Sequence, residues 1–158
     1  MALRQETLGE GRDVEALYDL AFAPGRQALS SYRLREGVAP VADLGLVIED
    51  APHGIAGAIR FWPVQVGIVE ALLLGPVAVH PTHQGEGLGA LLIGRGVERA
   101  REQGWSRILL VGDVPYYGRF GFRQLQGVEM PPPTNPARVL GLGDWAGVTG
   151  AVARAPLV

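Results

Sequence analysis

The chain contains no cysteine and no lysine. The absence of cysteine excludes disulfides, thiolate metal sites and a cysteine nucleophile. The absence of lysine excludes a Walker-type phosphate loop and Schiff-base catalysis. No apolar run reaches the length of a membrane span, and the first residues hold no apolar core of a signal peptide. We therefore expect a cytoplasmic protein that has no membrane partner.

Neither positive nor negative residues are in marked excess. The formal net charge is −2 and no basic block stands out, so a nucleic acid partner is not expected. The histidines His53, His80 and His83 lack the spacing of a metal site, and we expect no metal ion. A length of 158 residues with 47% hydrophobic residues predicts a single domain over residues 1–158.

The hydrophobic pattern changes period along the chain. It predicts a helix over Gly11–Ala23, ended by Pro24-Gly25, and a second helix over Arg26–Gly37. A longer amphipathic helix is expected over Leu88–Gly104, and residues 114–122 hold at most one helical turn. The strand-like runs are Leu44–Asp50, Ile55–Gly67, Ile68–Pro81, Arg107–Asp113 and Gly147–Val158.

The order of these elements favours a mixed sheet in an α/β or α+β domain. Residues 51–54, "APHG", are a natural hairpin turn between two strands. One crossover helix follows further down the chain. A fully parallel, doubly wound sheet would need regular alternation of strands and helices, which the first half lacks.

A glycine-rich turn lies between an apolar strand and the longest helix, in Val79–Leu92. Such a turn binds anions well, because glycines let the backbone curl and a helix start offers free N–H groups. One interpretation is a dinucleotide fingerprint, Gly85-x-Gly87-x-x-Ala90, with Asp113 at the end of the next strand. Against it, "HPTHQ" separates strand and fingerprint, and the chain after Asp113 is too irregular for a βαβαβ unit.

The overlapping pattern Gln84-x-x-Gly87-x-Gly89 resembles the acyl-CoA loop of the GNAT (Gcn5-related) N-acetyltransferases. In that family the loop follows a bulged strand. Here Gly75-Pro76 interrupts the preceding strand, and proline lacks the N–H that a regular ladder needs.

A second feature of the family lies downstream in "YYGRFGF". GNAT enzymes commonly place a tyrosine four residues before a Gly-Phe pair, and Tyr117 stands four residues before Gly121-Phe122. With the segment 21–37, the chain is similar to one bacterial branch of the family, the YhbS-like predicted acetyltransferases. Asp113 departs from the wider family, where many members carry Asn.

The resemblance implies a GNAT fold, with a mixed, mostly antiparallel central sheet, a bulged and splayed strand pair, and flanking helices. It implies direct transfer of an acetyl group from acetyl-CoA to a primary amine of a small molecule or peptide. It also allows a homodimer. The residues implied to bind acetyl-CoA are Val77, Ala78, Val79, Gln84, Gly85, Glu86, Gly87, Leu88, Gly89, Ala90, Asp113 and Tyr117.

The same resemblance assigns two catalytic roles. Tyr117 would be the general acid that protonates the departing CoA thiolate, with an aromatic core residue as the alternative. Glu70 would be the general base acting through water, with a solvent-facing strand carboxylate as the alternative. Asp113 would either orient substrate or cap the short turn after it. Residues that line the acceptor side in this interpretation are Arg33, Arg35, Arg60, Phe61 and Trp62.

The sequence is also compatible with two other functions. The first is a non-catalytic acyl-CoA-binding or regulatory module on the same fold. The second is a dinucleotide-binding protein. The identity of the acceptor does not follow from the sequence, because GNAT acceptor sites are built from variable helices and loops.

Overall fold

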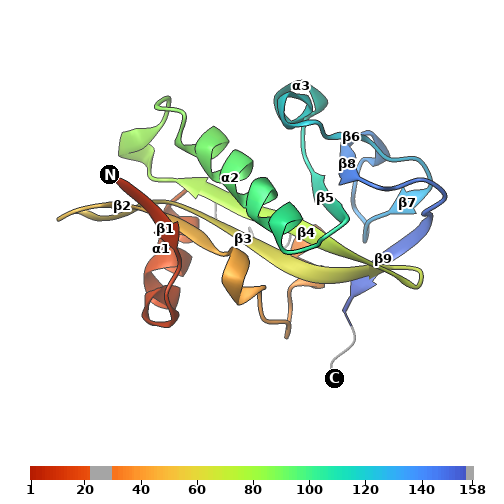
Figure 1. Cartoon of the computed structure of the whole chain (residues 1–158), viewed down its shortest axis with the longest axis horizontal. Helices are drawn as coiled ribbons and strands as arrows, with labels where there is room; N and C mark the ends of the chain where they lie inside the picture. The colour runs from red at the N-terminus through yellow and green to blue at the C-terminus, as the bar shows by residue number, and fades with distance from the viewer. Residues whose placement is uncertain (22–29, 156–158) are drawn as a thin grey trace.

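The computed structural model describes residues 1–21 and 30–155 of the chain (Figure 1). Its strands are β1 (Ala2–Gln5), β2 (Leu46–Asp50), β3 (Gly54–Val66), β4 (Val69–Val79), β5 (Arg107–Val111), β6 (Arg123–Gln124), β7 (Val128–Glu129), β8 (Val139–Gly143) and β9 (Gly150–Arg154). Its α-helices are α1 (Gly11–Ala21), α2 (Leu88–Glu102) and α3 (Val114–Tyr117). Short 3-10 helices are Leu8–Glu10, Ser30–Leu34, Ala42–Leu44, Pro81–His83, Gly118–Phe120 and Pro136–Arg138.

One mixed sheet runs through these elements in the order β1-β2-β3-β4-β5-β8-β6, and β9 pairs with the end of β3. The pairs along this path are antiparallel except β4 with β5, which are parallel and joined by α2 as the crossover helix. The mixed, mostly antiparallel sheet predicted from the sequence is confirmed. This topology also contradicts a dinucleotide-binding fold, which needs a parallel sheet.

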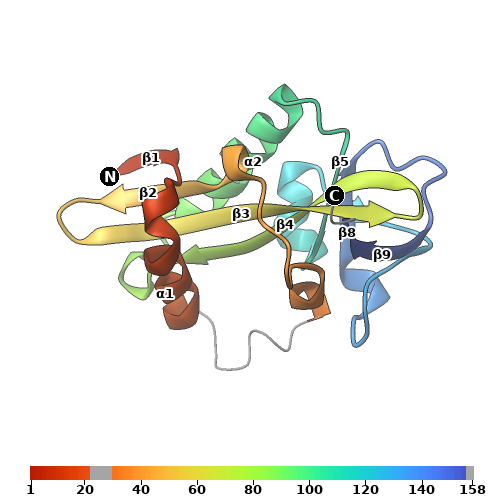
Figure 2. The same cartoon turned by 90° about the horizontal axis from the view of Figure 1, so that it is seen from below.

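Helices cover both faces of the sheet (Figures 1 and 2). Helix α2 lies on one face, where Leu92 and Ile93 pack with Phe61 in one buried cluster. Helix α1 lies on the other face, where the buried Val14 and Tyr18 pack against strand residues. Successive side chains of β3 therefore serve opposite layers, as the period of a strand requires.

The centre of the sheet is interrupted at one place. Ile59 pairs with Val77 and Phe61 pairs with Leu74, so Arg60 alone lies opposite the two residues Gly75-Pro76. Two residues facing one define a β-bulge. The bulge that the proline predicted is confirmed.

Strands β4 and β5 separate just before this bulge. Their parallel ladder consists of the pairs Leu72–Ile108 and Leu73–Leu109. Beyond Leu73, β4 continues to Val79 along β3 while β5 pairs with β8 on its other side. The splayed strand pair implied by the family resemblance is therefore present.

Several local expectations need correction. Residues 22–29 of the predicted helices lie outside the described residues, and Ser30–Leu34 form a 3-10 helix instead of the α-helix predicted over Arg26–Gly37. Strands β1, β6, β7 and β8 were not predicted. They are short, and β8 contains two glycines, so its sequence carries little strand signal. Among residues 1–21 and 30–155, no helix has both the length and the apolar character that crossing a bilayer requires.

Two glycines on α2 test the packing of this layer. A Cβ added at Gly96 would lie 2.8 Å from ring atoms of the buried Phe61, whereas one added at Gly94 meets nothing within 4 Å. We predict that Gly96→Ala lowers the free energy of unfolding by about 1–3 kcal/mol through overpacking. The matched Gly94→Ala change should raise it by about 0.5–1 kcal/mol, because alanine favours the helix.

Urea unfolding of both variants measures these changes. A Gly96→Ala protein as stable as Gly94→Ala would contradict the close approach of α2 to β3.

Candidate functional site

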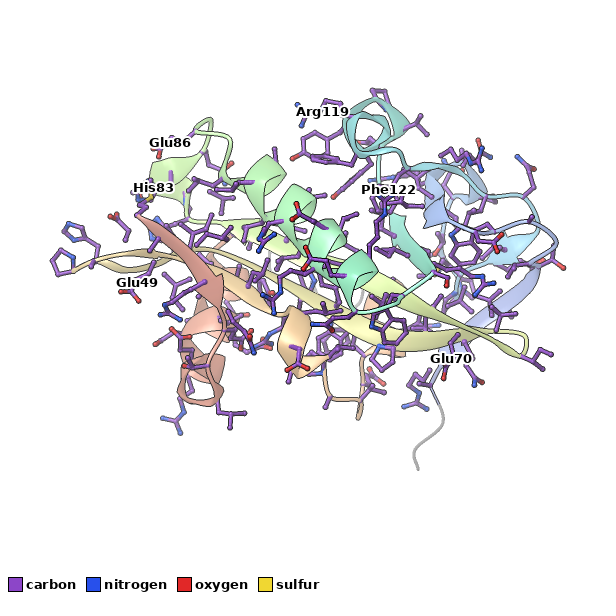
Figure 3. All side chains as sticks on the ribbon, viewed as in Figure 1. Glu49, Glu70, His83, Glu86, Arg119 and Phe122 are labelled. Atoms are coloured by element: carbon purple, nitrogen blue, oxygen red, sulfur yellow. The ribbon has the colours of Figure 1, made fainter. Side chains whose placement is uncertain are left out.

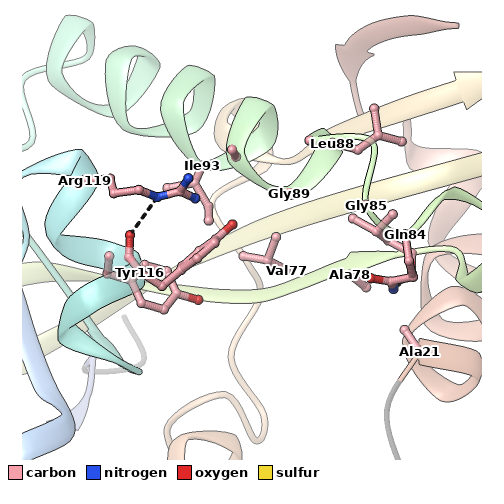
Figure 4. Close-up of a pocket in the computed structure, with 14 residues that line it drawn as sticks. Ala21, Val77, Ala78, Gln84, Gly85, Leu88, Gly89, Ile93, Tyr116 and Arg119 are labelled. Carbon is pink, nitrogen blue, oxygen red and sulfur yellow. Dashed lines mark hydrogen bonds between the residues drawn. The ribbon is translucent and has the colours of Figure 1, made fainter.

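A pocket of about 500 Å³ lies where β4 and β5 have separated (Figure 4). Its walls come from the end of β4, the loop and first turns of α2, and the short helices after β5. The lining residues are Ala21, Val77, Ala78, Val79, Gln84, Gly85, Gly87, Leu88, Gly89, Ala90, Ile93, Tyr116, Tyr117 and Arg119. Most of the predicted cofactor-binding residues therefore lie together.

The floor of the pocket is the open edge of β4. Val77, Ala78 and Val79 pair on one side with Ile59, Ala58 and Gly57 of β3. On the other side the ladder with β5 has already ended. Backbone groups on that edge are available to an extended ligand, which can add to a strand as another strand would.

The glycine loop forms one end of the pocket. Gly85 and Gly87 have φ values of +82° and +80°, a region that residues with a side chain rarely adopt. Gly87 is also the N-cap of α2, and helical bonding begins where Leu91 N–H donates to the Gly87 carbonyl at 3.1 Å. The N–H groups in the first turn of α2 have no partner within the helix. They can therefore donate to an anion that binds at the helix start.

The loop is fixed to the strand that it follows. The amide Nε2 of Gln84 donates to the Val79 carbonyl at 3.0 Å. His80 caps the short helix Pro81–His83, because its Nδ1 accepts from the Thr82 N–H at 3.2 Å. This contact gives His80 a structural role at the start of the loop.

His83 fixes the outer side of the loop. Its Nδ1 lies 3.0 Å from Glu86 Oε1 and its Nε2 lies 2.9 Å from Asp50 Oδ2. Hydrogen bonding to Glu86, and then to Asp50, raises the pKa of His83. The Glu86 side chain therefore faces His83, and Glu86 is not among the residues that line the pocket (Figure 3). Its contact with a cofactor stays a prediction. Within the described residues, no group of three or more His, Asp or Glu is arranged to hold a metal ion.

The opposite end of the pocket is aromatic. Tyr117 packs edge-to-face on Phe122 with ring centroids 6.1 Å apart, and Tyr116 stands over it at 4.9 Å. A Cβ at Gly112 would lie 2.3 Å from the Tyr117 ring, so only glycine lets the ring lie there. Burial, followed by the nearby Tyr116 and Asp113, raises the pKa of Tyr117 above its ordinary value. The phenol is therefore protonated at neutral pH.

Sequence reasoning missed Arg119, the next charged residue after Tyr117. Its guanidinium carbon lies 4.5 Å from the centre of the Tyr116 ring and 5.4 Å from that of Phe120. Its Nε donates to the Tyr116 carbonyl at 3.2 Å, shown as a dashed line in Figure 4. The signal was present, because Arg119 belongs to the same "YYGRFGF" segment that identified Tyr117.

Two predicted site residues lie elsewhere. Asp113 occupies the N-cap position of α3 without a side-chain capping bond, and its carboxylate lies 3.5 Å from Arg138. Glu70 is exposed beside the β3–β4 hairpin, where it pairs with Gln65, far from His83 and Glu86 in Figure 3. Neither lines the pocket, so a proton transfer by Glu70 at this pocket has no support in its position.

Aromatic side chains hold the bulge of β4 from the face that α1 covers. Trp62 Nε1 donates to the Gly75 carbonyl at 2.6 Å, and Tyr18 Oη donates to the Pro76 carbonyl at 3.2 Å. Both carbonyls of the bulge are thereby engaged on the side opposite α2. Beside them lies a second, smaller pocket of about 80 Å³, lined by Glu15, Tyr18, Tyr32, Arg35, Trp62 and Pro76.

The five predicted acceptor-side residues separate into three groups. Arg35 and Trp62 line the small pocket. Arg60 is buried in ion pairs, and Phe61 is fully buried in the core under α2. Arg33 is exposed.

The chain matches a known protein family. Residues 42–124 match the family described as Acetyltransferase (GNAT) domain. The chain is 30% identical to the uncharacterized N-acetyltransferase YhbS of Escherichia coli (strain K12), in an alignment that covers 96% of this chain and 95% of that protein.

Solved structures agree with the sequence match. The crystal structure of E. coli YhbS in complex with CoA has a TM-score of 0.81 and 27% identity, covering 98% of this chain and 89% of that one. A GNAT family acetyltransferase from Brucella melitensis in complex with acetyl-CoA has a TM-score of 0.73 and 28% identity, covering 98% and 95%. The chain therefore belongs to the GNAT family of N-acetyltransferases.

Proposed function

We propose that this enzyme transfers an acetyl group from acetyl-CoA to a primary amine by direct attack. The observation that carries the proposal is that one pocket brings together an open strand edge, a glycine loop at a helix start, and a protonated tyrosine. The structural relatives solved with CoA or acetyl-CoA support the choice of co-substrate.

The pyrophosphate of CoA would bind at the loop from Gln84 to Ala90. The first-turn N–H groups of α2 point to this place, and the positive end of the helix dipole favours a negative charge there. Gly85 and Gly87 leave the backbone uncovered, since a Cβ at either would meet open space. Arg119, at the aromatic end, supplies a cation to the same pocket.

The pantetheine arm would then lie along Val77–Val79. Its two amides can pair with the free edge of β4 as a short added strand. This places the thioester at the bulge, where a backbone N–H of the same strand can donate to the acetyl carbonyl oxygen. Such a donor stabilises the negative charge that develops on that oxygen during attack.

The chemical step has two proton transfers. The amine nitrogen forms a bond to the acetyl carbon, and collapse of the tetrahedral intermediate breaks the carbon–sulfur bond. Tyr117 donates its phenolic proton to the departing sulfur, a role that its raised pKa preserves across neutral pH. The proton lost by the amine needs a different acceptor, because Tyr117 is already protonated.

A non-catalytic acyl-CoA-binding module would share the cofactor pocket but would not need Tyr117. The single domain over residues 1–158, the cytoplasmic location and a homodimer remain predictions from the sequence and the family.

Removal of one hydroxyl tests the role of Tyr117. We predict that Tyr117→Phe lowers kcat by about 100-fold, the usual contribution of a general acid, while CoA still raises the melting temperature. Tyr116→Phe removes the neighbouring hydroxyl as the matched control and should have a smaller effect. Release of free thiol from acetyl-CoA over an amine panel measures both. Equal turnover of Tyr117→Phe and wild type would exclude the general-acid role.

The conformation of the glycine loop gives a second prediction. Gly87 has φ +80°, so Gly87→Ala imposes a backbone strain of about 1–2 kcal/mol or shifts the loop. We expect Kd for CoA to rise by about 10-fold, since displaced N–H groups no longer converge on the pyrophosphate. Titration calorimetry with CoA measures the change, and Gly94→Ala on the same helix is the control. An unchanged Kd in Gly87→Ala would place the pyrophosphate elsewhere.

A further inference from the structure

The loop from Gln84 to Ala90 carries one acidic residue, Glu86. Its two neighbours, Gly85 and Gly87, line the cofactor pocket, whereas Glu86 does not. A carboxylate here adds negative charge beside the place where we expect an anion. Like charges repel over about 8 Å at physiological ionic strength, so an uncompensated Glu86 would weaken the binding of a pyrophosphate.

His83 is placed to compensate this charge. Its Nδ1 lies 3.0 Å from Glu86 Oε1, and its Nε2 lies 2.9 Å from Asp50 Oδ2. A neutral imidazole has one N–H, so it can donate to only one of the two carboxylates. The imidazolium has two N–H groups and can donate to both. The geometry therefore fits the cation, and charge-assisted bonds of this kind are the strong ones.

Asp50 fixes the other end of this bridge. It is the last residue of β2, and it pairs with Gly54 of β3 across the hairpin. Its carbonyl also accepts from the His53 N–H at 2.6 Å. The imidazolium thus ties Glu86 to a hairpin that belongs to the central sheet. While the bridge is intact, the Glu86 carboxylate is directed at His83 (Figure 3).

Two further histidines lie in the same corner of the molecule. His53 of the hairpin and His80 before the short helix line one pocket together with Asp50 and His83. The ring of His80 lies 6.5 Å from that of His83, and its Nδ1 accepts from a backbone N–H, so this nitrogen carries no proton here. Hydrogen bonds to Glu86 and Asp50 raise the pKa of His83 above its ordinary value. The cation of the bridge is therefore His83.

We propose that His83 is a positioning residue for the cofactor, whose imidazolium compensates the charge of Glu86 and so lets the glycine loop accept the pyrophosphate of CoA. The inference rests on the pyrophosphate position given under the proposed function. When His83 gives a proton to solvent, one N–H donor is lost and the negative charge of Glu86 is no longer balanced. Affinity for CoA is therefore full below the raised pKa of His83 and falls as the pH rises through it.

Titration calorimetry with acetyl-CoA, from about pH 6 to about pH 9, tests this. Binding is followed because Tyr117 and the amine of an acceptor also titrate during turnover. We expect Kd of the wild type to rise by about 5-fold or more across the range. His83→Gln is neutral at every pH, so its Kd should already be raised at about pH 6. Ionisation of the ligand itself is common to all proteins and cancels in the ratio of variant to wild type.

Glu86→Gln separates charge compensation from a purely mechanical anchor. It keeps the length of the side chain but removes the charge, so it should bind acetyl-CoA at least as tightly as the wild type at about pH 9. His53→Gln, an exposed histidine of the same pocket, is the matched control and should keep the wild-type pH profile. The melting temperature without ligand reports whether each variant is folded.

Nuclear magnetic resonance assigns the effect to one residue. The chain has three histidines, so comparison with His83→Gln identifies the His83 ring signals. Coupling between two binding events is reciprocal, so bound CoA should raise the pKa of His83. In Glu86→Gln this rise should be smaller, because the charge that connects proton and ligand is absent.

The outcomes separate the two proposals. The same pH dependence in wild type and His83→Gln overturns the role of His83 and leaves acetyl transfer intact. A Glu86→Gln protein that binds as weakly as His83→Gln shows that the bridge only holds the loop, and it overturns charge compensation. A wild-type protein that does not bind acetyl-CoA overturns the proposed function and this inference together.

Discussion

The functional geometry depends on a single irregularity, the bulge where Arg60 lies opposite Gly75-Pro76. A regular strand would bond to both of its neighbours along its full length. Here Trp62 and Tyr18 engage the two bulge carbonyls from the α1 face, and the β4–β5 ladder ends at Leu73. The backbone N–H and C=O groups on the β5 side of β4, which would normally pair with a neighbouring strand, are therefore available to a ligand. The cost of the interrupted ladder is offset by the aromatic hydrogen bonds and by the buried core on both sides.

The same bulge divides the site into two chemically different halves. On the α2 side the lining is mainly backbone and apolar side chains, and among the described residues that line it Arg119 is the one charged group. On the α1 side, Glu15 and Arg35 stand among aromatic rings. A large, multiply charged cofactor suits the first half because helix-start N–H groups spread its charge.

The sequence predicted those parts of the site that short-range geometry determines. Gly85 and Gly87 have φ values that other residues avoid, so glycine is recognisable there in the sequence. The proline of Gly75-Pro76 lacks the N–H that a regular ladder needs, so the sequence also indicates the interruption of the strand. The role of Glu70 stays a prediction from the family resemblance, and Glu70 lies outside the pocket, where it pairs with Gln65 beside the β3–β4 hairpin. The surroundings of a strand side chain depend on its pairing partners, which the sequence alone does not give. Arg35 was named only as one of several arginines, since its burial depends on residues far along the chain.

Tyr117 depends on both local sequence and long-range contacts. Its distance from Gly121-Phe122 is a local feature, but its chemistry depends on what surrounds the ring. Gly112, at the end of β5, provides the space, and Phe122 provides an aromatic partner. Burial keeps the phenol neutral, and a neutral phenol can give a proton to a thiolate that forms beside it. The divergence of β5 from β4 therefore opens the pocket and also places Tyr117, the acid that we propose, at its far wall.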